Sequence, residues 1–69
     1  MKHYGIEIIG YGARRRFCIK EIIPERGTNP VNGREYKTEH AAREHAEHMG
    51  LTVEAVGDFY ALMAAIKNI

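Results

Sequence analysis

The chain has 69 residues and a net charge of +1, with 45% hydrophobic and 28% charged residues, which predict one globular domain over residues 1–69 and exclude a disordered chain. Its single cysteine, Cys18, excludes an intrachain disulfide, and no apolar run approaches the roughly 20 residues that span a bilayer. The first ten residues lack the apolar segment and cleavage site of a signal peptide, so we expect a cytoplasmic protein.

The first third of the chain predicts an antiparallel β-hairpin. Apolar and polar residues alternate over residues 3–9, as they do in a half-buried strand, and a glycine-containing turn follows at residues 10–13. The returning strand is expected over residues 14–23 and ends before Pro24, which cannot donate to a ladder. The alternation fails at residues 21–23, where a β-bulge would restore it.

The middle of the chain predicts a loop, a short strand and a helix. Residues 24–33 are rich in proline, glycine and asparagine, which is typical of a mobile loop, and a third strand is expected at residues 34–36. Thr38 has the position of an N-cap, and Gly50 has that of a C-terminal stop. The apolar stripe of the helix between them consists of Ala42, Ala46 and Met49.

The nineteen residues after Gly50 allow two interpretations. In the first, residues 51–56 form a strand, and Asp58 caps a helix over residues 59–68. In the second, Thr52 caps one longer helix, which would contain Gly57 at a cost of about 1 kcal/mol. The β-branched valines favour strand then helix. The expected fold is therefore α+β, of order ββ(β)αβα, with one helix packed on a two- or three-stranded sheet.

No signature of a catalytic site or a metal site is present. His45 and His48 lie three residues apart and His40 lies one turn earlier, but two histidines on a helix supply half a zinc site at most. We expect these histidines on a solvated helix face. Cys18 has no identifiable base near it in the sequence, so we expect a core residue rather than a nucleophile. The chain is predicted to be non-enzymatic, without cofactor or metal.

Charge is segregated along the chain. Residues 13–37 contain seven basic and three acidic residues, whereas residues 38–69 contain two basic and five acidic residues. Arginine forks suit phosphates and guanine edges, so the basic segment is the candidate surface for nucleic acid or another partner. The candidate binding residues are Arg14, Arg15, Arg16, Lys20, Arg26, Arg34 and Lys37, together with Tyr11 and Tyr36.

The segment NPVNGREYKTEHAAREHA resembles the small arm-type (AP2-like) DNA-binding domains at the N-termini of phage tyrosine integrases. The matching positions are Asn29, Pro30, Gly33, Arg34, Tyr36, Thr38 and Ala42. The resemblance implies a three-stranded sheet backed by one helix, with the free sheet face contacting DNA. On that face it would place Arg14, Arg16, Lys20 and Arg34.

Two functions follow as expectations. The first is a nucleic-acid-binding regulator of phage or mobile-element type that uses the arginine-rich sheet. The second is a small protein-binding regulator or inhibitor, of the phage anti-defence type, because arginine and tyrosine dominate interface hot spots. The tyrosines expected to be exposed are Tyr4, Tyr11, Tyr36 and Tyr60. A homodimer through the apolar C-terminal helix, FYALMAAI, is compatible with both functions.

Overall fold

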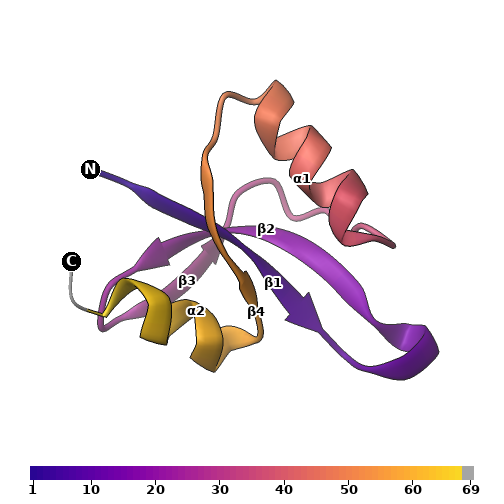
Figure 1. Ribbon diagram of the computed structural model, residues 1–69, viewed down its shortest axis with the longest axis horizontal. Coiled ribbons are helices and arrows are strands. Elements are labelled where there is room, and N and C mark those ends of the chain that lie inside the picture. Colours follow the sequence, from indigo (N-terminus) through magenta and orange to yellow (C-terminus); the bar gives the residue numbers. More distant parts are fainter. Residues whose placement is uncertain (68–69) are drawn as a thin grey trace.

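A computed structural model describes residues 1–67, which form a four-stranded mixed sheet with one helix on each face (Figure 1). The elements in chain order are β1 (His3–Ile9), β2 (Arg16–Ile23), β3 (Gly27–Pro30), α1 (Glu39–His48), β4 (Val53–Gly57) and α2 (Phe59–Ile66). The strand order is β3-β2-β1-β4, and only β4 lies parallel to its neighbour. The predicted α+β class is confirmed. Within residues 1–67, no helix is long and apolar enough to cross a membrane.

The β1–β2 hairpin begins its second strand later than predicted. The two strands pair without interruption from His3 opposite Ile22 to Ile9 opposite Arg16. Between them, a 3-10 turn at Gly12–Arg14 continues the predicted glycine turn by one residue. Arg14 therefore lies in the turn and not in a strand, which corrects the expectation that it opens β2.

The predicted bulge in β2 is also wrong. The pairing of β1 with β2 is continuous through Ile22, whose side chain lies on the opposite sheet face from Ile19. The alternation fails in the sequence because each face of the sheet has its own core, so both kinds of position take apolar residues. The irregularity lies instead between β1 and β4, where Val53 pairs with Tyr4 and Ala55 pairs with the next residue.

The third strand forms earlier than predicted. Residues 27–30 pair with β2 after a tight turn in which Glu25 has a φ of 65° and the Arg26 amide donates to the Ile23 carbonyl at 3.0 Å. The segment interpreted as a mobile loop thus contains β3. The predicted strand over residues 34–36 is reduced to one antiparallel bridge, in which Tyr36 and Phe17 exchange two backbone hydrogen bonds of 2.8 Å.

Helix α1 covers one face of the sheet, as its sequence predicts. The Thr38 hydroxyl accepts a hydrogen bond from the Ala41 amide at 3.1 Å, which confirms the N-cap. Ala42 and Ala46 are fully buried and contact a core that includes Ile6 and Ile19. The helix is followed by Gly50 with a φ of 76°, as expected of a helix stop.

Helix α2 covers the other face. Asp58 accepts a hydrogen bond from the Ala61 amide at 2.8 Å, and Leu62 and Ile66 form a second core with Ile22. Strand β4 precedes this helix, which confirms the strand-then-helix interpretation. The predicted helix extended to Asn68, which lies outside the described residues.

Candidate functional site

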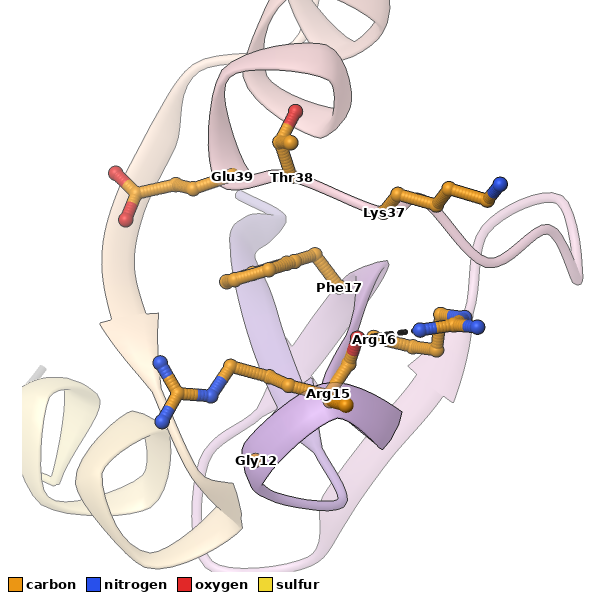
Figure 2. A pocket seen from close by; sticks show the side chains of 8 residues that line it. Gly12, Arg15, Arg16, Phe17, Lys37, Thr38 and Glu39 are labelled. Atoms are coloured by element: carbon orange, nitrogen blue, oxygen red, sulfur yellow. Dashed lines mark hydrogen bonds between the residues drawn. The ribbon is translucent and has the colours of Figure 1, made fainter.

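A basic cleft lies between the β1–β2 turn and the start of α1 (Figure 2). Its volume is about 570 Å³. The lining residues are Gly12, Ala13, Arg15, Arg16, Phe17, Lys37, Thr38 and Glu39. They come from two segments that are about twenty residues apart in the chain, so the basic cleft exists only in the folded protein.

The bridge between Phe17 and Tyr36 brings these two segments together. Its two backbone hydrogen bonds hold the chain before α1 against the start of β2, which places Lys37 beside the arginines that precede Phe17. Figure 2 shows the side chains of Arg16 and Lys37 extending toward the same side of the basic cleft, while Arg15 extends to the other side. Arg16 is further oriented by donating from Nη1 to the Arg15 carbonyl at 2.9 Å.

The electrostatics of the basic cleft favour an anion. Three basic side chains line it against one acidic side chain, Glu39. The Glu39 carboxylate accepts a hydrogen bond from Arg43 at 3.0 Å, so its charge is already compensated from within α1. The N-terminus of α1 adds a partial positive charge at the same place. Half-buried Phe17 supplies an aromatic surface among these charges.

Other predicted binding residues lie in the segments around the basic cleft. Arg14 is exposed in the 3-10 turn that precedes Arg15. Tyr11 is 86% exposed in the same turn. Arg34 lies in the chain segment that leads to Lys37, and its guanidinium carbon is 5.6 Å from the centre of the Tyr36 ring. These three side chains can extend a basic and aromatic surface beyond the cleft.

Three predicted binding residues are placed elsewhere by the structure. Lys20 is half-buried and pairs with Glu7, its Nζ lying 3.8 Å from the carboxylate. Arg26 lies in the β2–β3 turn, at the opposite end of β2 from Arg16. Tyr36 is only 9% exposed and belongs to the core, so the expectation of an exposed interface tyrosine is wrong at this position.

Tyr36 also takes part in a hydrogen-bonded chain that the sequence did not reveal. Its hydroxyl accepts from Asn32 Nδ2 at 3.1 Å and lies 2.6 Å from Nδ1 of His45. His45 is half-buried and packs edge-on against the Tyr36 ring, whereas His40 and His48 are exposed as expected. These hydrogen bonds link the loop after β3 to α1. No residue spacing in the sequence signals it, because it depends on how the loop after β3 folds against α1.

Removal of the Tyr36 hydroxyl tests how much these hydrogen bonds stabilise the protein. We expect Tyr36→Phe to lower the free energy of unfolding by about 1 kcal/mol, because one hydroxyl joins two partners across separate segments. Urea unfolding followed by far-UV circular dichroism measures the change. The matched control is Tyr11→Phe, which removes the same atom from an exposed turn and should change stability by less than about 0.5 kcal/mol. Equal stability of the two variants would contradict the role given to the hydroxyl.

Two further side chains with reactive groups, Cys18 and His3, are buried. Cys18 is buried, and this burial raises the pKa of its thiol above the ordinary value although Lys20 acts in the other direction. A thiol held protonated is a poor nucleophile. Buried His3 lies with Nδ1 3.0 Å from the Glu54 carboxylate and joins β1 to β4. Over residues 1–67, the structure has no group of three or more His, Cys, Asp or Glu side chains that could hold a metal ion.

Comparisons of the chain with known protein families, with curated proteins and with solved structures give no match. The chemistry of the basic cleft and of the surfaces around it is therefore what indicates a function.

Proposed function

We propose that this protein is a non-enzymatic nucleic-acid-binding regulator of phage or mobile-element type, and that the basic cleft binds the phosphate backbone. One observation carries the proposal: Arg15, Arg16 and Lys37 line one cleft beside the N-terminus of α1, with Arg15 on one side and the other two on the opposite side, and the only carboxylate that lines it is already paired. Guanidinium forks bind phosphate oxygens in two places at once, and lysine adds a point charge. Phe17 offers a surface on which an unpaired base can stack.

The proposed contact surface differs from the one that the sequence resemblance implies. Arm-type domains use a free sheet face, whereas here α1 packs on one face and α2 on the other. Lys20, which would lie on the second face, is held by Glu7. The resemblance over residues 29–42 supports nucleic-acid binding in general, and the position of the arginines favours the edge of the fold at the β1–β2 turn.

The double variant Arg15→Gln/Arg16→Gln tests the proposal. The logarithm of the affinity falls linearly with the logarithm of the salt concentration. Each arginine that contacts a phosphate makes this negative slope steeper, by about 0.9 on a duplex and about 0.7 on a single strand. We therefore expect the slope of the double variant to be less steep by about 1.8 on a duplex and about 1.4 on a single strand, and its affinity to be lower by at least about tenfold at low salt. Fluorescence anisotropy of labelled oligonucleotides over a salt series gives both values, with single-stranded and duplex DNA and RNA as separate arms.

Arg26→Gln is the matched control, because it removes an identical charge from the far end of β2. It should leave affinity within about twofold and the salt slope almost unchanged. The affinity lost per charge removed can then be compared between the double variant and Arg26→Gln. Equal losses would show that binding depends on net charge alone, and would contradict a binding site in the basic cleft. Failure of the unaltered protein to bind any oligonucleotide at low salt would overturn the proposal as a whole.

A protein-binding regulator or inhibitor is the second candidate, favoured by the exposure of aromatic residues. Tyr11 is 86% exposed and Tyr60 is 79% exposed, and tyrosine is enriched at interface hot spots. A pull-down from host lysate with and without nuclease separates the two candidates. A protein that is retained after nuclease treatment and lost with Tyr11→Ala supports the second, whereas retention that depends on nucleic acid supports the first. Self-association through α2 is compatible with both.

A further inference from the structure

Phe17 brings an aromatic ring into the basic cleft, and the ring is recessed. The side chain is half-buried, because it packs against the core that contains Ile6 and Ile19. Its remaining surface lines the cleft. Figure 2 shows the Phe17 side chain in the middle of the lining residues, between Arg15 on the side of the turn and Thr38 on the side of α1. An apolar ring is therefore held among charged side chains.

A double helix cannot bring a base to this ring. The base pairs of a duplex are stacked on one another, so only their edges are exposed in the grooves. Those edges lie at the bottom of a major groove about 8.5 Å deep, so a side chain that contacts them must project from the protein. Phe17 does not project, because it is half-buried and lies inside a cleft. In a complex with a duplex, the ring would contact no base.

A single strand can place a base on the ring. Its bases can turn out of the stack, and proteins that bind single strands take up such bases by stacking them on aromatic side chains. The cleft volume of about 570 Å³ lies within the range of about 300–1,000 Å³ that holds a small ligand, so it admits one nucleotide. Arg15 extends to one side of the cleft, and Arg16 and Lys37 extend to the other. The two phosphates that flank a base on Phe17 would then face cations on both sides.

We propose that the basic cleft selects single-stranded nucleic acid and holds one unstacked base on Phe17, with the flanking phosphates bound by Arg15 and by Arg16 with Lys37. This inference rests on the proposed function, because it names the form of nucleic acid that the same cleft takes. A duplex carries one phosphate charge per about 1.7 Å of its axis, more than a single strand, so attraction by charge alone would favour the duplex. A preference for the single strand must therefore come from the base and the ring.

Fluorescence anisotropy with three oligonucleotides of equal length tests this selection. The first is a labelled single strand, the second is the same strand paired with its complement, and the third is a single strand in which every base is replaced by an abasic site. Each is prepared as DNA and as RNA. With the type of sugar that binds more tightly, we expect the first to bind at least about fivefold more tightly than the other two at one salt concentration. The reason is that stacking of one base on an aromatic side chain contributes about five- to 150-fold in affinity.

Phe17→Leu tests the role of the ring. Leucine keeps apolar contact with the core but has no aromatic face, so we expect this variant to bind the single strand about as weakly as the unaltered protein binds the abasic strand. Far-UV circular dichroism establishes whether the variant is folded, and if it is not, the abasic comparison on the unaltered protein decides. Phe59→Leu is the matched control, because it removes a phenyl ring from α2, which covers the opposite face of the sheet. It should bind all three oligonucleotides as the unaltered protein does.

The outcomes separate this inference from the proposed function. A duplex bound at least as tightly as the single strand, or equal affinity for the strands with and without bases, would overturn the inference. The proposed function would stand in both cases if the salt slope still depended on Arg15 and Arg16. A folded Phe17→Leu variant that retains the preference for bases would place the base elsewhere and also overturn the inference. Absence of binding to every oligonucleotide at low salt would overturn both.

Discussion

Leu62→Ala is expected to leave most of the protein unfolded at 25 °C. Leu62 is completely buried in the second core, where the only other fully buried residues described are Ile22 and Ile66. Truncation of a buried leucine costs about 2–5 kcal/mol through lost transfer energy and the cavity left behind. A chain of this size has only about 3–5 kcal/mol of net stability from its core. The loss is therefore comparable to the whole free energy of unfolding.

Urea unfolding of Leu62→Ala, monitored by far-UV circular dichroism, measures this loss. Leu62→Met is the matched control, because it conserves volume and should cost less than about 1.5 kcal/mol. A loss below about 1 kcal/mol for Leu62→Ala would mean that α2 does not pack on the sheet as described.

Local signals in the sequence predicted the helices well. The hydroxyl of Thr38 and the carboxylate of Asp58 each accept a backbone hydrogen bond from an amide three residues on, as an N-cap requires. Gly50 takes the left-handed conformation expected at a helix end. These features depend on neighbouring residues only, so their chemistry is visible in the sequence.

Features that depend on distant residues were predicted less well. The position of β3 depends on a turn in which Glu25 adopts a positive φ, a conformation that few non-glycine residues take. The second core forms because α2 folds back across Gly5 and Ile22, a contact between distant parts of the chain. Because the sequence does not show this contact, Ile22 was interpreted as a failure of alternation and assigned to a bulge.

The candidate site also combines features that depend on neighbouring residues with features that depend on distant ones. The concentration of basic residues before the helix was apparent from the sequence, and Arg15, Arg16 and Lys37 do line one cleft. Which of the seven predicted basic residues would line the cleft was not apparent, because this depends on the length of the turn and on the Phe17–Tyr36 bridge. Lys20 does not line the cleft and instead forms an ion pair with Glu7, a residue thirteen positions earlier.

Gly5→Val is the second substitution expected to abolish the fold. A Cβ atom on Gly5 would lie 2.8 Å from Ile22 Cδ1, 2.9 Å from the Ala55 carbonyl oxygen and 3.0 Å from Leu62 Cδ2. Overpacking of a core costs about 1–3 kcal/mol, and the two methyl groups of valine add to a Cβ that already has no room. We expect a loss of at least about 3 kcal/mol, measured by urea unfolding. Asn29→Val, on an exposed edge-strand position, should change stability by less than about 0.5 kcal/mol.

Gly5→Ala tests which neighbouring atom prevents a Cβ atom from being accommodated at position 5. Alanine in a strand is normally favoured over glycine by about 0.5–1 kcal/mol through chain entropy, so a net loss requires that steric overlap exceed this gain. Ile22→Val removes the Cδ1 atom, but the Ala55 carbonyl is backbone of β4 and can move only with the strand. We therefore expect Gly5→Ala to destabilise the protein by about 1–3 kcal/mol, with no rescue in the double variant Gly5→Ala/Ile22→Val. Recovery of stability in the double variant would assign the limit to the Ile22 side chain and contradict a close backbone approach of β4 to β1.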